Sequence, residues 1–225
     1  MMRPVKRGMS RIAMLLTAAA MLAVPTAASH GQAAPARDDI VNALKNFDSG
    51  PDLDIAAIRQ KTLEQSRSRS RKEPEASKRP MIVPEILNLP TFTVSVDFDS
   101  DTPVVRPSSY ETVGRIADAL VQASLLPYSF LIVGHTSSDG KREANVMLSQ
   151  RRADALRDSL VNTFKISSKR VQSLGLGEEQ FIDQAHPTSP VNLQIQIVTI
   201  AKQPEQSEQP PAAAPAPAKK KAKKR

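Results

Sequence analysis

Several polar side chains that could take part in chemistry lie together in the sequence, between Gly134 and Leu160. His135, Ser137 and Asp139 are residue types that act as base, nucleophile and orienting acid in many hydrolases. They lie too close together in the sequence to converge in that geometry. The sequence also lacks phosphate-binding loops, paired catalytic carboxylates and clusters of metal ligands. We therefore predict no enzymatic activity, no metal site and no cofactor, and we expect His135 to hold its loop by a hydrogen bond to the backbone.

The same stretch has the pattern of a loop that joins a buried strand to a helix. Residues 130–133 form a short, fully apolar run, which is typical of a strand buried on both faces. Gly134 and Gly140 bound a tight loop. The helical pattern that follows is strongest from Ser149 to about Thr163, and Ser149 is a candidate for its N-cap.

Hydrophobic periodicity predicts further strands and helices around this loop. Alternating apolar and polar side chains predict a strand over residues 91–98. Apolar side chains at helical spacing predict a helix capped by Ser108 or Ser109. Strands over residues 171–176 and 193–200 complete the set, with an irregular stretch or a short helix between them. The order β-α-β-α-β-(α)-β predicts an α/β (α+β) fold, in which helices pack on a mixed sheet.

Residues at fixed positions in this pattern resemble the OmpA-like C-terminal domain, a family that binds the diaminopimelate peptide of bacterial peptidoglycan. The resemblance covers about Leu89 to Lys202, half of the chain. The matching positions are Val96-Asp97-Phe98-Asp99-Ser100, Gly134-His135-Thr136, Gly140, Asn145, Leu148, Ser149, Arg152, Ala153 and the run from Val171 to Glu178. The resemblance implies the OmpA-like fold, with the loop after residue 134 at the ligand site.

Diaminopimelate carries an ammonium and a carboxylate on one stereocentre, so its binding site needs an acid and a cation. In the family, an Asp after Gly-His-Thr and the Arg of Leu-Ser-x-x-Arg-Ala supply these charges. Arg152 stands at the Arg position, whereas Ser137 stands at the Asp position. A hydroxyl carries no charge, and losing such an ionic contact costs about 2–4 kcal/mol of binding free energy. The resemblance therefore implies that peptidoglycan is bound weakly or in an altered form.

Thr136, Asp139 and Asn145 complete the peptidoglycan-binding site that the resemblance implies. Asp139 lies two residues beyond Ser137, and its carboxylate either replaces the missing one or serves an ordinary turn role. Asn145 is expected to organise the turn from the loop into the helix. Arg152 has two structural alternatives, which are an ion pair with a helix neighbour and packing of its stem on the sheet.

The sequence departs from the family a second time, just before the last strand. The family usually has Asn-Arg-Arg at this place, whereas this chain has Asn192-Leu193-Gln194. Residues 185–190 also lack the usual Gly-Arg. Basic residues that could support the site are therefore missing, which again implies weakened or altered binding.

Five segments are expected along the chain. Residues 1–33 have the pattern of a signal peptide. A basic N-terminal region is followed by an apolar stretch from Ile12 to Val24, and then by small residues that suit a cleavage site. An uncleaved anchor is the alternative, but this stretch rises only about 20 Å as a helix, against a hydrocarbon core of about 30 Å. The other segments are a short helical segment (34–65), a flexible charged and Pro-containing linker (66–90), the OmpA-like domain (91–202) and a disordered Pro/Ala/Lys tail (203–225).

Charge and cysteine content narrow the range of partners. The net charge of +8 includes four positive charges in the signal segment and six between Lys219 and Arg225, which leaves −2 for the rest. A nucleic-acid-binding face is therefore not expected. The Lys-rich end is either a solubilising tail or a contact for anionic lipids or polymers of the envelope. The chain has no Cys, which excludes disulfides, thiolate metal sites and a lipid-modified N-terminal Cys.

These features predict an exported, non-catalytic protein of the Gram-negative cell envelope. We expect it in the periplasm, associated with the outer membrane or with peptidoglycan, which its OmpA-like domain binds. The alternative is a protein-interaction or scaffold module that keeps the fold but has lost peptidoglycan binding. A third interpretation is adhesion to surfaces through the charged tail alone, which would weaken steeply with salt.

Overall fold

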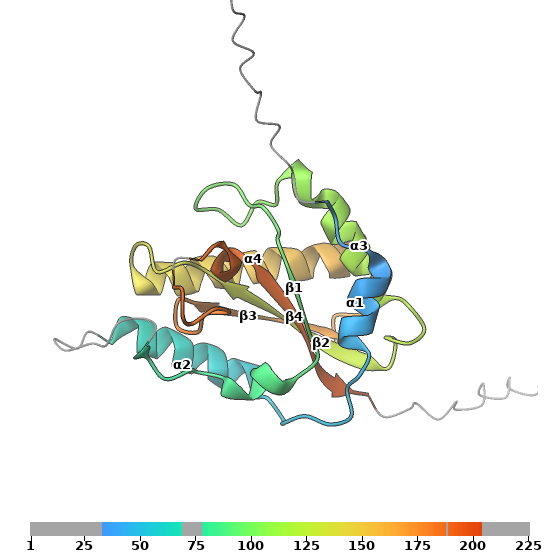
Figure 1. Cartoon of the computed structure of the whole chain (residues 1–225), viewed down its shortest axis with the longest axis horizontal. Coiled ribbons are helices and arrows are strands. Elements are labelled where there is room, and N and C mark those ends of the chain that lie inside the picture. Colours follow the sequence, from blue (N-terminus) through green and yellow to red (C-terminus); the bar gives the residue numbers. More distant parts are fainter. Residues whose placement is uncertain (1–32, 69–77, 188, 204–225) are drawn as a thin grey trace, which may run out of the picture. The chain divides into compact units, whose positions relative to one another are not determined.

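The computed structural model describes residues 33–68, 78–187 and 189–203 (Figure 1). The predicted signal peptide, apart from residue 33, and the predicted tail, apart from residue 203, lie outside these ranges, as do residues 69–77 of the predicted linker. Within the described ranges, no helix has both the length and the apolar character needed to cross a membrane.

A four-stranded mixed sheet lies at the centre of the fold (Figure 1). Its strands are β1 (Thr91–Val94), β2 (Tyr128–His135), β3 (Val171–Gly177) and β4 (Ile195–Lys202), in the spatial order β1-β4-β2-β3. β2 and β3 are parallel, as expected for strands joined by a helical crossover, whereas β4 is antiparallel to both β1 and β2. The predicted fold class and the predicted mixed sheet are therefore confirmed.

Three helices cover one face of the sheet. They are α1 (Arg37–Leu44), α3 (Tyr110–Leu120) and α4 (Arg142–Asp158). α1 contacts α3 and β1, whereas α4 contacts β2 and β3. Because side chains alternate between the faces of a strand, Phe130 and Ile132 of β2 both point into this layer, where they are fully buried.

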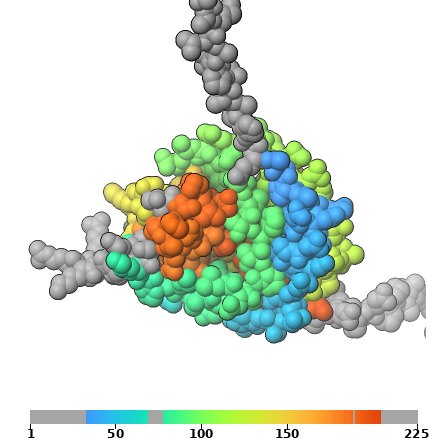
Figure 2. Space-filling model, viewed as in Figure 1, coloured from blue at the N-terminus to red at the C-terminus, as the bar shows by residue number. Residues whose placement is uncertain are grey.

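The opposite face of the sheet is covered by residues that precede β1 in the sequence (Figure 1). They include α2 (Ile55–Arg67) and the 3-10 helix η2 (Pro84–Asn88). The buried side chains of this layer are Phe47, Ile55, Ile82, Val83, Ile86 and Leu89, packed with Leu131, Val133, Leu174, Leu176, Val198 and Ile200 of the strands. Figure 2 shows the described residues before β1, coloured blue to green, in close contact with the rest of the described chain.

The prediction of a flexible linker over residues 66–90 is wrong for residues 66–67, which end α2, and for the part from 78 to 90. This part packs on the sheet and forms η2, and it buries Ile82, Ile86 and Leu89. The physical reason is that the alternate side chains of β2, β3 and β4 form a second apolar face, which would otherwise be exposed to water. The apolar side chains between the prolines of this segment were the signal that could have predicted its burial.

β1 and β4 are each shorter at one end than predicted. β1 ends at Val94, and Phe98 forms only an isolated bridge with Val105. β4 begins at Ile195, because Pro190–Leu193 form the 3-10 helix η5, which takes the place of the predicted start of this strand at residue 193. In both segments, the alternation of apolar and polar side chains in the sequence therefore extends beyond the residues that pair with a neighbouring strand.

Neither predicted cap forms a side-chain hydrogen bond to its helix, although Ser109 does stand at the N-cap position of α3. The 3-10 helix η3 (Pro107–Ser109) leads into α3, and Ser109 Oγ accepts a hydrogen bond from the Asp97 amide at 2.8 Å instead of capping the helix. α4 begins at Arg142, so Ser149 lies inside the helix, which then continues as a π-helical turn, η4 (Ser159–Thr163). The first turns of α4 contain many polar residues, so the helical spacing of apolar side chains is not apparent there in the sequence.

Two glycines allow α4 to lie directly against β2 and β3. A Cβ atom at Gly134 would come within 2.4 Å of the Ser149 carbonyl oxygen, and one at Gly175 within 2.2 Å of the Gln150 amide nitrogen. Ser149 Oγ also accepts a hydrogen bond from the amide of Gly177 at 2.9 Å. These contacts fix the position of α4, and with it the loop at the start of this helix.

Candidate functional site

The candidate site lies around the loop 136–141, between the end of β2 and the start of α4. His135, the last residue of β2, is buried, and its Nδ1 lies 2.8 Å from the carbonyl oxygen of Gln180. Its Nε2 lies 2.9 Å from the side-chain amide of Gln196. Burial lowers the pKa of His135, which keeps the ring neutral near pH 7. The predicted backbone hydrogen bond of this residue is therefore confirmed.

Asn145 joins the loop to the helix. Its buried side-chain amide donates hydrogen bonds to the carbonyl oxygens of Ser137 at 3.2 Å and Asp139 at 3.0 Å. The same nitrogen lies 2.7 Å from Oε2 of Glu178, a residue in the turn after β3. Gly140 has a φ of 98°, a conformation that glycine adopts without steric cost. Asn145 thus organises the turn from loop to helix, as predicted.

Ser137 and Asp139, the two candidate ligands of an ammonium group, are in direct contact. Ser137 Oγ donates a hydrogen bond to Asp139 Oδ2 across 2.8 Å, and Asp139 is exposed to solvent. The hydroxyl proton is therefore directed at the carboxylate, while the lone pairs of Oγ are available to accept a hydrogen bond. The structure brings these two predicted site residues together.

Thr136 lies at the base of the loop. Its amide donates a hydrogen bond to the carbonyl oxygen of Gly177 at 3.1 Å, which continues the pairing of β2 with β3. Its side-chain hydroxyl is buried and has no hydrogen-bond partner among the described residues. Thr136 therefore fixes the start of the loop through its backbone.

Arg152 is half-buried on α4 and is held at two points of the β1–α3 loop. Its Nε donates a hydrogen bond to the carbonyl oxygen of Thr102 at 3.2 Å. The guanidinium carbon lies 5.0 Å from the centroid of the Phe98 ring, a cation–π distance. Burial lowers the pKa of Arg152, and the charge of nearby Asp101 opposes this shift. An ion pair with a helix neighbour, one of the two structural alternatives for Arg152, is not formed within the described ranges.

Comparison with known proteins identifies the region that contains these residues. A model of the OmpA family matches residues 97–192. These residues form an OmpA-family domain. Outer membrane porin F of Pseudomonas aeruginosa is 35% identical over 97 residues, which are 43% of this chain and 27% of that protein. A peptidoglycan-associated lipoprotein of Mesorhizobium japonicum is 34% identical over 93 residues, which are 40% of this chain and 54% of that protein.

Solved structures are also similar to this OmpA-family domain. One of them is the structure of the peptidoglycan-associated lipoprotein from Burkholderia pseudomallei, whose sequence is 25% identical to this chain. The match has a TM-score of 0.38 and covers 48% of this chain and 87% of that chain. The chain spans about half the length, or less, of the curated relatives it matches. The shared region is thus the domain and not the whole of either relative.

A buried ionic network supports the OmpA-family domain behind its loop. Glu178 and Glu179 are almost fully buried in the turn after β3. Arg142, the first residue of α4, donates from Nε to Glu179 Oε1 at 2.7 Å. Arg79, from the segment that precedes β1, lies 3.0 Å from Glu178 Oε1. The resemblance included Glu178, but its partner at position 79 is remote in the sequence and carried no signal.

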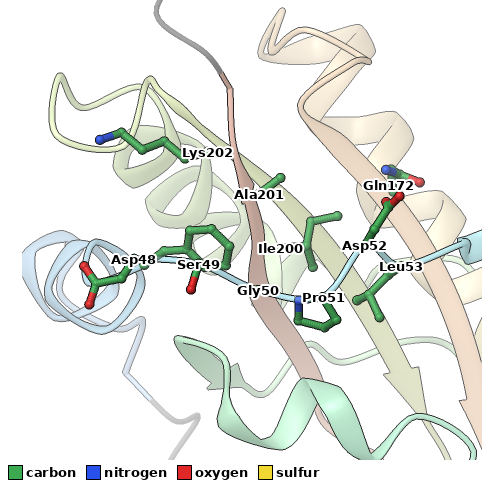
Figure 3. A pocket seen from close by; sticks show the side chains of 11 residues that line it. Asp48, Ser49, Gly50, Pro51, Asp52, Leu53, Gln172, Ile200, Ala201 and Lys202 are labelled. Atoms are coloured by element: carbon green, nitrogen blue, oxygen red, sulfur yellow. The ribbon is translucent and has the colours of Figure 1, made fainter.

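A separate hollow of about 420 Å³ lies away from the loop of the OmpA-family domain (Figure 3). It is lined by residues 47–53 and 200–202 together with Gln172. Residues 200–202 are at the end of β4, where Lys202 pairs with Tyr128, the first residue of β2. The start of β4 lies beside the loop, because Ile195 pairs with Gly134 near the end of β2. This hollow therefore lies at the opposite end of the sheet from the candidate site.

Proposed function

We propose that this is an exported, non-catalytic cell-envelope protein whose OmpA-family domain binds peptidoglycan through the diaminopimelate of a stem peptide. The family match and the name of the peptidoglycan-associated relatives support this proposal. We place the protein in the periplasm, in association with the outer membrane or with peptidoglycan. The observation that carries the proposal is that the Arg152 guanidinium is held in one orientation by Thr102 and Phe98.

The guanidinium of Arg152 is fixed in place while its outer edge stays available. Nε is bound to Thr102, and one side of the group lies over Phe98. The two Nη groups make no hydrogen bond or ion pair with the described residues. A planar, held guanidinium with free Nη groups has the geometry that binds a carboxylate with two parallel hydrogen bonds. We assign the carboxylate of diaminopimelate to this edge.

The loop 136–141 supplies the other wall of the proposed site. Thr136 and Asn145 hold the loop, and Ser137 presents a neutral hydroxyl where the family has a carboxylate. An ammonium group gains less from a hydroxyl than from a charge, even with Asp139 bound to that hydroxyl. The expected loss of about 2–4 kcal/mol corresponds to roughly 30- to 1000-fold in affinity, so we propose weak or altered binding.

The neutral residue at position 137 also favours a second candidate, a scaffold module that keeps the fold without the ligand. A sedimentation assay with insoluble peptidoglycan at low salt separates the two. Retention that falls on Arg152→Ala but not on Arg151→Ala supports peptidoglycan binding, because Arg151 is an exposed neighbour with the same charge. The absence of any retention of the unmodified protein supports the scaffold.

The Lys-rich end of the chain lies outside the described residues, and we propose that it adds contacts with anionic lipids or polymers of the envelope. The same sedimentation assay, repeated after deletion of residues 219–225, tests how much of the retention it provides. Retention that survives the deletion and still depends on Arg152 belongs to the domain. Retention that disappears with the deletion, and that falls steeply with salt, is charge-driven adhesion.

A further inference from the structure

We propose that Asp101 supplies the carboxylate that Ser137 lacks, so that Arg152 and Asp101 together receive the zwitterionic amino-acid head of the ligand. This inference rests on the proposed function and adds a residue on another loop to the site. It places the ammonium of the ligand on the β1–α3 loop, and not only on the loop that follows β2. Its basis is the geometry of residues 97–106.

A tight turn presents Asp101 beside the residue that holds Arg152. The amide of Thr102 donates a hydrogen bond to the carbonyl oxygen of Asp99 at 3.1 Å, which closes the turn. Asp101 has a φ of 56°, in the left-handed region, which Asp and Asn tolerate better than most residues. The next carbonyl oxygen, that of Thr102, accepts the hydrogen bond from Arg152. Asp101 is therefore adjacent in the chain to the anchor of the guanidinium.

Asp101 is the free carboxylate among the three acids of this loop. Asp97 accepts a hydrogen bond from Ser108 Oγ at 3.0 Å, and Asp99 is paired with Arg106 at 3.0 Å. Asp101 is exposed, and it makes no hydrogen bond or ion pair with the described residues. It keeps its full capacity to accept hydrogen bonds from a ligand.

Asp101 and Arg152 attract each other without closing an ion pair. The charge of Asp101 acts on the guanidinium, yet no nitrogen of Arg152 lies within 4.0 Å of its carboxylate. Two opposite charges that influence each other without forming an ion pair suit a ligand group that carries both charges. The ligand carboxylate would meet the guanidinium, and the ligand ammonium would meet the Asp101 carboxylate.

Asp139 is the weaker candidate for this role. One of its oxygens already accepts the hydrogen bond of Ser137, so part of its capacity is used within the loop. Asp101 is next in the chain to Thr102, which anchors Arg152, and its charge acts on the guanidinium, whereas Asp139 lies on the other loop. We therefore assign the ammonium mainly to Asp101, with Ser137 as a neutral hydrogen-bond acceptor.

The inference is tested by calorimetric titration of the protein with a diaminopimelate-containing stem peptide. Asp101→Asn removes the charge but keeps a residue that tolerates the left-handed turn, so any loss reports the charge. We expect its affinity to fall by about tenfold, the usual size of one charge-assisted hydrogen bond. Asp139→Asn should change affinity by less than about twofold, as for an exposed and already bonded acid.

Ser137→Asp makes the outcome decisive, because it places a carboxylate at the position used by the family. We expect this variant to bind more tightly than the unmodified protein and to reduce the effect of Asp101→Asn. If Ser137→Asp and the unmodified protein bind and Arg152→Ala does not, but Asp101→Asn binds as well as the unmodified protein, the role of Asp101 is wrong and the proposed function stands. If none of these proteins binds the peptide, the proposed function and the role of Asp101 are both wrong.

Discussion

Arg152 donates a hydrogen bond from Nε to the main-chain carbonyl oxygen of Thr102, and this contact connects α4 to the β1–α3 loop. The two residues are 50 positions apart in the sequence. Together with the stacking on Phe98, the contact holds a half-buried guanidinium in one orientation. The orientation leaves the Nη groups as the part of Arg152 that can meet a ligand.

Arg152→Lys tests whether the planar fork matters beyond its charge. Lys keeps the positive charge but cannot form the Nε contact or two parallel bonds to a carboxylate. We expect the affinity for the stem peptide to fall by about tenfold or more. Stability should fall by less than about 1 kcal/mol, because one half-buried hydrogen bond and one ring contact are lost. Titration and urea unfolding measure the two effects, with Arg151→Lys as the control, and equal affinity of both variants would argue against the fork.

Gly175→Ala tests the close approach of α4 to the sheet. The new Cβ would meet the amide nitrogen of Gln150 at 2.2 Å and its Cα at 2.4 Å, so backbone must move. We expect a loss of about 3 kcal/mol or more in the free energy of unfolding. The control is Gly114→Ala in α3, where nothing lies within 4 Å of a new Cβ. That variant should gain about 0.5–1 kcal/mol from helix propensity, and similar stability of the two variants would contradict the packing described here.

His135 should make stability fall as the pH falls below about 6.5. Burial lowers its pKa in the folded protein below the ordinary 6.5, so below 6.5 the unfolded chain binds a proton that the folded chain does not. The free energy of unfolding should therefore fall with falling pH, by at most about 1.4 kcal/mol per pH unit. Urea unfolding at several pH values measures this slope. It should flatten in His135→Gln and persist in His186→Gln, whose side chain is exposed. An unchanged slope in the first variant would show that another group is responsible.

Ile86→Ala tests whether residues 78–90 are part of the folded core. Ile86 is 3% exposed and packs on the second face of the sheet, so its truncation should cost about 2–4 kcal/mol of unfolding free energy. The neighbouring Leu87 is 56% exposed, and Leu87→Ala should cost less than about 0.5 kcal/mol. Thermal or urea unfolding distinguishes the two. Equal, small effects would mean that this segment is a loosely attached linker, as its sequence suggested.

Much of the fold could be predicted because its strands show the polarity pattern that burial imposes. Residues 171–176 lie within β3, and the apolar run at 130–133 lies in β2. The ends of the elements could not be predicted in the same way. Val94 ends β1 because pairing with β4 stops there, although the alternation in the sequence continues to Phe98. Hydrogen-bonded pairing depends on a partner strand that is distant in the sequence.

The candidate site could be predicted only where one motif contained the residues. Arg152, Ser137 and Asn145 were found through the spacing of the loop and helix. The partners Thr102 and Arg79 could not be found, because each is brought to the site by a turn or a segment that lies far away in the chain. A motif identifies side chains of one stretch, whereas the contacts that orient them come from the packed fold.

The most direct measurement compares two stem peptides that differ only in the carboxylate on the zwitterionic stereocentre of diaminopimelate, free in one and amidated in the other. Both are titrated against the unmodified protein and against Arg152→Ala. We expect amidation to weaken binding to the unmodified protein by about tenfold and to have no further effect in the variant, because the guanidinium is the partner of that carboxylate. Equal effects of amidation in the two proteins would contradict the central role of Arg152.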